Sequence, residues 1–323
     1  MRAAVVERPG SPEVLQVRDL PDPVARPGWV VVRVKAFGLN RSEMFTRQGH
    51  SGDAVQFPRV LGIECVGVVE DASDSGLAVG QKVAAVMGDM GRAYDGGYAE
   101  YALLPTQQVM PIDTDLPWST FGAIPETFLT AWGSLVESLG VEAGGALLVR
   151  GGSSSVGMAT ATLAKRMGVT VLATTRQESK VGALRQNGAD HVVIDDGGIA
   201  GRVRTLCPGG VDYALELVGP VTYADSARSL KPGGIVCWAG ILANVWDEDA
   251  IGELPRDLRA VRYSSHVITA AGYTDTLQGI VRSVESGAYR ANVHRVFTLD
   301  EIADAHRYME ANHAIGKLVV TVP

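Results

Sequence analysis

Long apolar runs are missing from this sequence. No window approaches the roughly 18 consecutive apolar residues that a membrane-spanning helix needs. Cysteine is scarce as well, because the chain has only Cys65, Cys207 and Cys237. Their odd number and wide spacing argue against a disulfide framework. The first residues, MRAAVVERPGSPEVLQ, contain neither the apolar core nor the cleavage site of a secretory signal. We therefore expect a protein of the reducing cytoplasm with no membrane partner.

An excess of positive charge is also absent. The 29 lysines and arginines are outnumbered by 36 acidic residues, giving a net charge of −7, and aromatic residues make up 6% of the chain. This balance argues against a nucleic-acid partner, since such surfaces are basic. Glycine is abundant at 38 of 323 residues. That length accommodates more than one domain, and the glycine content suits tight turns and backbone binding sites.

The chain changes character near Phe121. Before it, short strand-like runs such as AAVVER, VVVRVKAFG and KVAAVMG are separated by Gly, Pro and Asp, which predicts a compact antiparallel β domain. After it, the apolar run ALLVRGG precedes the helical pattern VGMATATLAKRMG, which Gly168 should end. Strands and helices then alternate as far as GGIVCWAG, as in a doubly wound parallel sheet. Near the C-terminus, Thr298 and Glu301 have capping-box spacing for another helix, and GKLVVTV reads as a strand.

A glycine- and serine-rich loop, VRGGSSSVG, lies between the first parallel strand and its helix. The dinucleotide fingerprint asks for glycine at three positions, which are occupied here by Gly152, Ser154 and Gly157. Backbone N–H groups and the helix dipole bind the anion, so one serine is compatible with that chemistry. The alternative is a plain turn. We expect a dinucleotide phosphate to bind Gly152, Ser153, Ser154, Ser155, Val156 and Gly157.

The end of the second parallel strand discriminates between cofactors. NAD enzymes place an acid there, whereas this chain reads ATTRQESK. Thr175, Arg176 and Lys180 suit the 2′-phosphate of NADPH, because arginine binds phosphate in a bidentate manner and lysine adds a point charge. A solvated helix start is the alternative, but cations have the wrong sign for that end of the helix dipole. The residues after the fifth parallel strand, Gly240, Ile241 and Leu242, should line the nicotinamide end of the crevice.

Taken in order, eight segments resemble the medium-chain dehydrogenase/reductase superfamily: GLNRSE, LGIECVG, GGYAEY, PETFLTAWGSL, RGGSSSVG, NGADHVVID, LKPGG and GKLVVTV. The resemblance covers essentially the whole chain. It implies an α/β fold in which a Rossmann doubly wound parallel sheet is inserted in a GroES-like β-rich catalytic domain. The expected bounds are residues 1–121 and 269–323 for the catalytic domain and 122–268 for the NADPH-binding domain.

Zinc ligands are absent where the resemblance would place them. In zinc enzymes of the superfamily the segment matching GLNRSE carries a cysteine and the one matching LGIEC carries a histidine, but here Asn40 and Ile63 occupy those positions. Glu126 falls at the third position. An amide and an alkyl side chain cannot replace thiolate and imidazole around tetrahedral zinc. The region of the structural zinc, VMGDMGRAYDGGYAEY, has no cysteine. We expect no metal.

The chain is most similar to the zinc-independent NADPH:quinone oxidoreductase branch, especially in NRSEMFTRQG and DAHRYMEANHAIGKLVV. The resemblance implies catalytic roles for Asn40 and Thr130 and a cofactor contact for Asn312. Phe45, where some relatives have a tyrosine, His50 and Ile63 are candidates for the substrate pocket, although a surface position is the simpler reading of His50. At the position of a relative's phosphate-binding tyrosine stands Asp195, an anion that weakens the NADPH assignment.

Without a metal, a simple ketone lacks a Lewis acid, whereas a conjugated acceptor delocalises the charge that develops during hydride transfer. We therefore expect NADPH-dependent reduction of a quinone or enone. The alternative enzyme is an enoyl-thioester or alkenal double-bond reductase, which would use the same residues. A further alternative is an NADPH-binding protein without turnover, similar to the lens crystallins of this branch, some of which bind RNA. The segment VRYSSHVIT suggests an edge strand that pairs in a homodimer.

Overall fold

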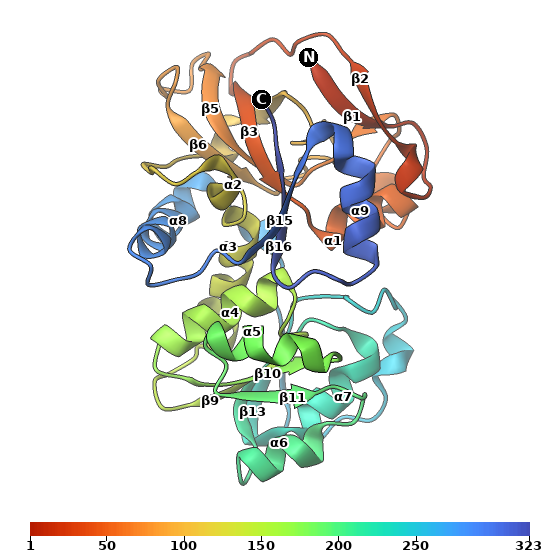
Figure 1. Ribbon diagram of the computed structural model, residues 1–323, viewed down its shortest axis with the longest axis vertical. Helices are drawn as coiled ribbons and strands as arrows, with labels where there is room; N and C mark the ends of the chain where they lie inside the picture. Colours follow the sequence, from red (N-terminus) through yellow and green to blue (C-terminus); the bar gives the residue numbers. More distant parts are fainter. The chain divides into compact units, whose positions relative to one another are not determined.

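The computed structural model describes residues 1–323 and divides into two compact units (Figure 1). The catalytic unit comprises Met1–Leu129 and Ser265–Pro323, and the nucleotide unit comprises Thr130–Ser264. The boundaries expected from the sequence lay after residues 121 and 268. The first observed boundary falls within helix α3 (Pro125–Gly133), whereas the expected one lay before that helix. No helix has the length and apolar character to cross a membrane.

The catalytic unit is built on two β-sheets. The smaller has the order β2 (Leu15–Asp19), β1 (Arg2–Val6), β4 (Arg59–Val60). The larger follows the order β15 (Val293–Thr298), β16 (Lys317–Thr321), β3 (Trp29–Gly38), β5 (Glu64–Asp71), β6 (Lys82–Val86), β8 (Val109–Pro111), with β7 (Tyr101–Pro105) also on β3. Its pairs are antiparallel, as expected, except for the parallel pair β15 and β16. Figure 1 shows the C-terminal strand β16 (blue) beside β3 (red-orange).

Helices of the catalytic unit are α1 (Arg41–Gln48), α2 (Trp118–Phe121), α3, α8 (Ala270–Glu285) and α9 (Ile302–Glu310). The capping box predicted for α9 is confirmed, because the Thr298 N–H donates to Glu301 Oε2 at 2.8 Å. The expected inward residues Ile302, Ala305 and Met309 are buried. Helix α1 was not expected from the sequence.

The nucleotide unit contains a parallel six-stranded sheet. Its order is β11 (His191–Ile194), β10 (Thr170–Thr175), β9 (Ala146–Arg150), β12 (Val211–Glu216), β13 (Leu230–Trp238), β14 (Arg259–Arg262). The helices are α4 (Ser155–Arg166), α5 (Val181–Gln186), α6 (Ala200–Leu206) and α7 (Pro220–Arg228), with a π-helical segment at Ser134–Leu139. Numbered within this unit, the order 3-2-1-4-5-6 is that of the doubly wound dinucleotide fold, so the predicted Rossmann sheet is confirmed. Its switch point lies between β9 and β12.

Strand β9 forms the centre of this sheet because its side chains are apolar on both faces. Leu147, Leu148 and Val149 are fully buried, as a central parallel strand requires. Gly168 has a φ of 77° and stands just beyond α4, where the sequence predicted the helix to stop. Short 3₁₀ turns lie at Pro12–Val14, Gly52–Ala54, Thr106–Gln108, Glu178–Lys180, Glu248–Ile251, Ser265–Val267 and Leu299–Glu301.

Candidate functional site

The loop after β9 has the close packing that a dinucleotide loop requires. A Cβ atom at Gly152 would lie 2.8 Å from the Ala173 Cβ, and one at Gly157 would lie 2.5 Å from the Gly151 oxygen. Ser154, at the second fingerprint position, caps α4: its Oγ accepts from the Gly157 N–H at 3.1 Å and donates to the Gly151 oxygen at 2.8 Å. Its hydroxyl hydrogen is thereby engaged within the loop, and binding of a phosphate by this loop stays a prediction. Ser155 and Val156 begin α4, where backbone N–H groups favour an anion.

The predicted cationic pair at the end of β10 is brought together. Arg176 is exposed, whereas Lys180 is 6% exposed. Burial lowers the pKa of Lys180, and the positive charge of Arg176 lowers it further, so the two cations are close enough to interact. Thr175 Oγ1 accepts from the Gln177 N–H at 3.2 Å and shapes the turn that carries Arg176. Two neighbouring cations are stabilised by a bound anion.

Asp195, the anion that the sequence analysis set against NADPH, is held by Arg150. The guanidinium Nε and Nη2 of Arg150 donate to Asp195 Oδ2 and Oδ1 at 2.5 and 2.8 Å, and Nη1 donates to Asp225 Oδ2 at 2.7 Å. The Arg150 side chain is fully buried and that of Asp195 is 9% exposed. Asp195 is therefore held in an ion pair within the protein, and it shares Arg150 with Asp225.

The segment after β13 reaches the phosphate loop inside the nucleotide unit. The Leu242 N–H donates to the Leu217 oxygen at 2.9 Å, and the Leu242 Cδ1 would lie 2.9 Å from a Cβ at Gly151. Gly240 packs so closely on Leu217 that a Cβ would meet its oxygen at 2.7 Å. Gly240, Ile241 and Leu242 thus follow the strand end at the switch-point side of the sheet. Thr130, at the start of the unit, is 6% exposed.

In the catalytic unit, Asn40 lies in a cluster of charged side chains. Lys317 Nζ donates to Asn40 Oδ1 at 2.6 Å and lies 2.7 Å from Glu64 Oε1. Asn40 Nδ2 donates to the same Glu64 oxygen at 2.9 Å and to Glu43 Oε1 at 3.2 Å. Pairing of β3 with β5 and with β16 brings the cluster together, because Asn40 follows β3, Glu64 begins β5 and Lys317 begins β16.

Both ends of the Asn40 amide are therefore engaged within the protein. In this arrangement the Nδ2 hydrogens point to carboxylates, and the catalytic role expected for Asn40 stays a prediction. Glu43 Oε2 also accepts from the Asn40 N–H at 2.5 Å, which caps α1. Glu43 is 1% exposed, and burial raises the pKa of its carboxyl to about 7. The cluster thus contains a carboxyl that titrates near neutrality.

The residues at the expected metal positions do not fit zinc. The Lys317 ammonium bonds the Asn40 oxygen, and a divalent cation and an ammonium repel each other in one place. Glu126, at the third position, accepts from Ser265 Oγ at 2.7 Å, and Ile63 provides no donor side chain. Cys65 is buried, which raises the pKa of its thiol to about 12 and opposes the thiolate that zinc binds. No cluster of three His, Cys, Asp or Glu side chains suitable for a metal occurs in the structure.

The other sequence-predicted residues of the catalytic unit lie in α1 or contact it. Phe45, in α1, is 8% exposed, and its ring centroid lies 6.4 Å from that of the exposed His50. Ile63 is buried, and its N–H donates to Glu43 Oε1, in the same helix, at 3.1 Å. Asn312 follows α9 with a φ of 59°, and its side-chain oxygen accepts from Arg41.

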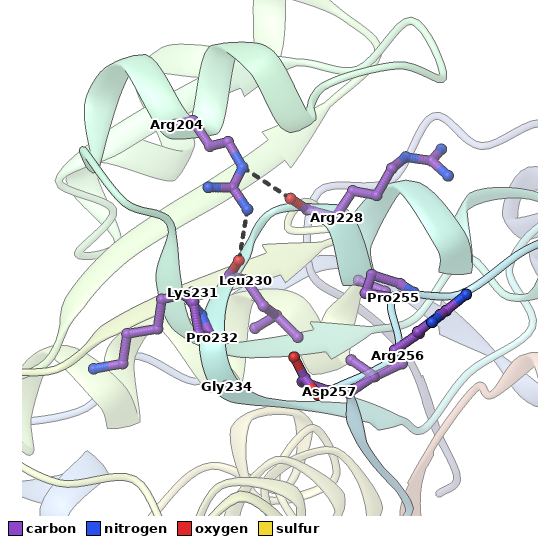
Figure 2. Close-up of a pocket in the computed structure, with 11 residues that line it drawn as sticks. Arg204, Arg228, Leu230, Lys231, Pro232, Gly234, Pro255, Arg256 and Asp257 are labelled. Carbon is purple, nitrogen blue, oxygen red and sulfur yellow. Dashed lines mark hydrogen bonds between the residues drawn. The ribbon is translucent and has the colours of Figure 1, made fainter.

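A cavity of about 240 Å³ lies at the amino-terminal end of the parallel strands (Figure 2). The phosphate loop lies at the opposite end, because it follows the carboxyl end of β9. The cavity is bounded by the end of α7, the start of β13 and residues 255–258, and none of the predicted site residues lines it. Arg204 donates to the backbone oxygens of Arg228 and Leu230 at 3.0 and 2.8 Å. Figure 2 shows the charged ends of Arg228 and Lys231 pointing away from one another, so these cations do not converge on a ligand.

Sequence reasoning missed Glu43, Glu64, Lys317 and Arg150 as members of these sites. A local sequence pattern could have identified Glu43, because Asn40 and Glu43 have the spacing of a capping box. No local pattern could have identified Lys317, because it lies 277 residues from its partner Asn40.

Comparison with known proteins gives two family matches and relatives along the full chain. Residues 26–114 match the model of the alcohol dehydrogenase GroES-like domain, and residues 187–320 match a model described as zinc-binding dehydrogenase. Quinone oxidoreductase of Homo sapiens is 27% identical over 328 residues, which cover 99% of this chain and 97% of that protein.

Two solved structures are similar to this protein over essentially the whole chain. An NAD-dependent alcohol dehydrogenase has a TM-score of 0.88 at 31% identity, with all of both chains covered. A mycobacterial protein solved in complex with NADPH has a TM-score of 0.89 at 25% identity, with 99% of this chain and 100% of that chain covered. The similar proteins thus include one named for NAD and one bound to NADPH.

Proposed function

The chain belongs to the medium-chain dehydrogenase/reductase superfamily, in its quinone oxidoreductase branch, and from that premise we propose a zinc-independent, NADPH-dependent reductase of quinones and other conjugated carbonyls. That the protein is an oxidoreductase follows from the family. The acceptor and the choice of NADPH are our proposal.

The proposal that the acceptor is a conjugated carbonyl depends on one observation. The ammonium of Lys317 bonds the amide of Asn40 at the position where zinc enzymes of the superfamily have a metal ligand. With no Lewis acid there, the site favours an acceptor that spreads the developing negative charge over its own conjugated system. We propose that Lys317 and Glu64 fix Asn40, and that Asn40 positions the substrate or the nicotinamide. The buried Glu43 carboxyl, with its pKa of about 7, is a proton reservoir beside them.

The cofactor assignment rests on charge at the end of β10. Bound NADPH would supply the hydride. Arg176 and Lys180 would hold its 2′-phosphate, and Ser155 and Val156 would present N–H groups to the pyrophosphate. The pairing of Asp195 with Arg150 supports this assignment, because an ion-paired carboxylate opposes a phosphate less than a free one. Thr130, Gly240, Ile241, Leu242 and Asn312 remain proposed cofactor contacts.

The test is oxidation of NADPH and NADH with quinones, enones and enoyl thioesters as acceptors. We expect conjugated carbonyls to be reduced with NADPH and Arg176→Ala with Lys180→Ala to weaken NADPH binding more than NADH binding. Reduction of enoyl thioesters alone would replace the quinone assignment with the alternative enzyme. An unchanged preference for NADPH in the double variant would contradict the 2′-phosphate assignment.

We also propose a homodimer through the edge of the parallel sheet. Strand β14 pairs with β13 on one side only, and the Tyr263 N–H donates to the Trp238 oxygen on that side. By strand alternation the Ala260 N–H points outward, where a second copy can pair. Ala260→Pro removes that donor and should convert a dimer into a monomer in sedimentation velocity. A monomeric wild-type protein would contradict the proposal.

A further inference from the structure

An arginine in a tightly turned loop of the catalytic unit has no counter-ion. The loop follows β6, and Met87, Gly88, Asp89 and Gly91 all have positive φ, at 59°, 56°, 68° and 74°. Left-handed backbone at two residues other than glycine is costly and persists only where the surroundings fix it. Tyr94 contributes by donating its hydroxyl hydrogen to the Gly88 oxygen at 2.6 Å. The turn ends at Arg92, whose N–H donates to the Asp89 oxygen at 3.0 Å.

The Arg92 guanidinium is held by two neutral groups from other parts of the same unit. Nη2 donates to Ser42 Oγ and Nη1 contacts His266 Nε2, both at 2.6 Å. A guanidinium has only donors, so the His266 nitrogen accepts and its ring is neutral. Burial and then the charge of Arg92 lower the pKa of His266, in agreement with that assignment. Two segments distant in sequence therefore orient a single cation.

No carboxylate of the protein forms an ion pair with this cation. Arg92 is half-buried, its Nε lies out of solvent without a hydrogen-bond partner, and it forms no ion pair. Asp89, in the same loop, acts on His266 but does not bridge to Arg92. The buried Arg47 and Arg150 differ, since Glu310 and Asp195 pair with them. A half-buried charge with neutral partners only is stabilised when an anion binds.

Ser42 ties this cation to the helix that Asn40 caps. It lies in the first turn of α1, between Asn40 and Glu43, and both of those neighbours belong to the cluster. We propose that Arg92, oriented by Ser42 and His266, binds an anionic group of the acceptor, so that the preferred substrates are conjugated carbonyls carrying a carboxylate. The planar fork of arginine suits a carboxylate in particular. This inference rests on the proposed function and specifies the substrate class of the same site.

A matched pair of acceptors tests the inference: a benzoquinone with a carboxyethyl side chain, and its methyl ester. The two share the reacting ring and differ in charge. We expect wild-type protein to prefer the carboxylate through a lower KM, and Arg92→Met to reduce the ratio of the two kcat/KM values by roughly 10- to 100-fold. Arg92→Lys should restore part of that ratio. Arg18→Met, which removes an exposed arginine paired with Glu7, should leave the ratio as in wild type.

A binding measurement separates this inference from the proposed function. Calorimetry with a non-reacting hydroquinone carboxylate and its methyl ester needs no turnover, and circular dichroism verifies that Arg92→Met is folded. Tighter binding of the carboxylate by wild type, lost in Arg92→Met, supports the inference even if neither quinone is reduced. Equal binding of the carboxylate and the ester by wild type overturns the inference, and so does a ratio of the two affinities that is unchanged in Arg92→Met. In either case, reduction of both quinones would leave the proposed function intact.

Discussion

Lys317 Nζ lies 2.7 Å from Glu64 Oε1, and both side chains are 1% exposed. The pair joins the last strand of the chain to β5 through β3, because Lys317 begins β16 and Glu64 begins β5. Asn40 bonds both partners, to Lys317 at 2.6 Å and to Glu64 at 2.9 Å. The desolvation penalty of a buried ion pair offsets much of its electrostatic attraction. We therefore expect this pair to fix the geometry of the cluster more than to stabilise the fold.

Removing one partner of this pair should destabilise the protein strongly. Lys317→Met leaves Glu64 buried beside Glu43 without a cation, and we expect a loss of about 3–5 kcal/mol in the free energy of unfolding. Chemical denaturation measures it. The double variant Lys317→Met with Glu64→Gln should recover part of the loss, because it removes the unpaired charge.

A surface pair provides the control for this prediction. Lys231 pairs with Asp212, but its side chain is 50% exposed, so Lys231→Met should cost far less. Equal losses for the two lysine variants would contradict the burial argument.

Glu43 should make stability depend on pH. Its folded-state pKa of about 7 lies above the ordinary value of 4.5 because of burial, so the folded protein binds this proton more tightly than the unfolded chain. Stability is therefore lost as the pH rises from about 4.5 to 7, by on the order of 3 kcal/mol for this group. Glu43→Gln should flatten that slope.

The readout for Glu43 is the difference between wild type and Glu43→Gln in unfolding free energy, measured from pH 5 to 8. The variant loses a carboxylate oxygen that accepts from the Asn40 N–H, which lowers its stability at every pH. Only the slope reports the titration. Parallel curves for the two proteins would show that Glu43 does not titrate in this range.

Asp195 should have little influence on cofactor choice. Both of its oxygens accept from Arg150, so its charge is already engaged in an ion pair. We expect Asp195→Asn to lower the melting temperature, because a buried ion pair is broken, while the Kd for NADPH changes less than about threefold. Isothermal calorimetry measures the Kd. If Asp195→Asn instead bound NADPH about tenfold more tightly than wild type, the charge of Asp195 would repel the 2′-phosphate and the prediction would be wrong.

The parts of the fold that follow from local sequence were predictable. The alternation of strands and helices in the nucleotide unit, the loop at Gly152 and the end of α4 at Gly168 each depend on residues close together in the chain. The capping box at Thr298 is equally local. Helix α1 was missed, although Asn40 and Glu43 have the spacing of a capping box.

The chemistry of the site depended on contacts that no local pattern contains. Lys317 lies 277 residues from Asn40, Asp195 lies 45 residues from Arg150, and His266 lies 174 residues from Arg92. The strand order of two sheets brings the first two pairs together, and sequence periodicity does not specify a strand order. The sequence could therefore indicate that zinc ligands are missing, but not that a lysine bonds Asn40 in their place.

The central claim is that this oxidoreductase transfers hydride from NADPH to a conjugated carbonyl without a metal. The most direct test is NADPH oxidation by chelator-treated protein with p-benzoquinone and, in parallel, with a saturated ketone. We predict that the quinone is reduced at the same rate before and after chelation and that the ketone is not reduced. Loss of quinone reduction on chelation, or reduction of the ketone and not the quinone, would contradict the account.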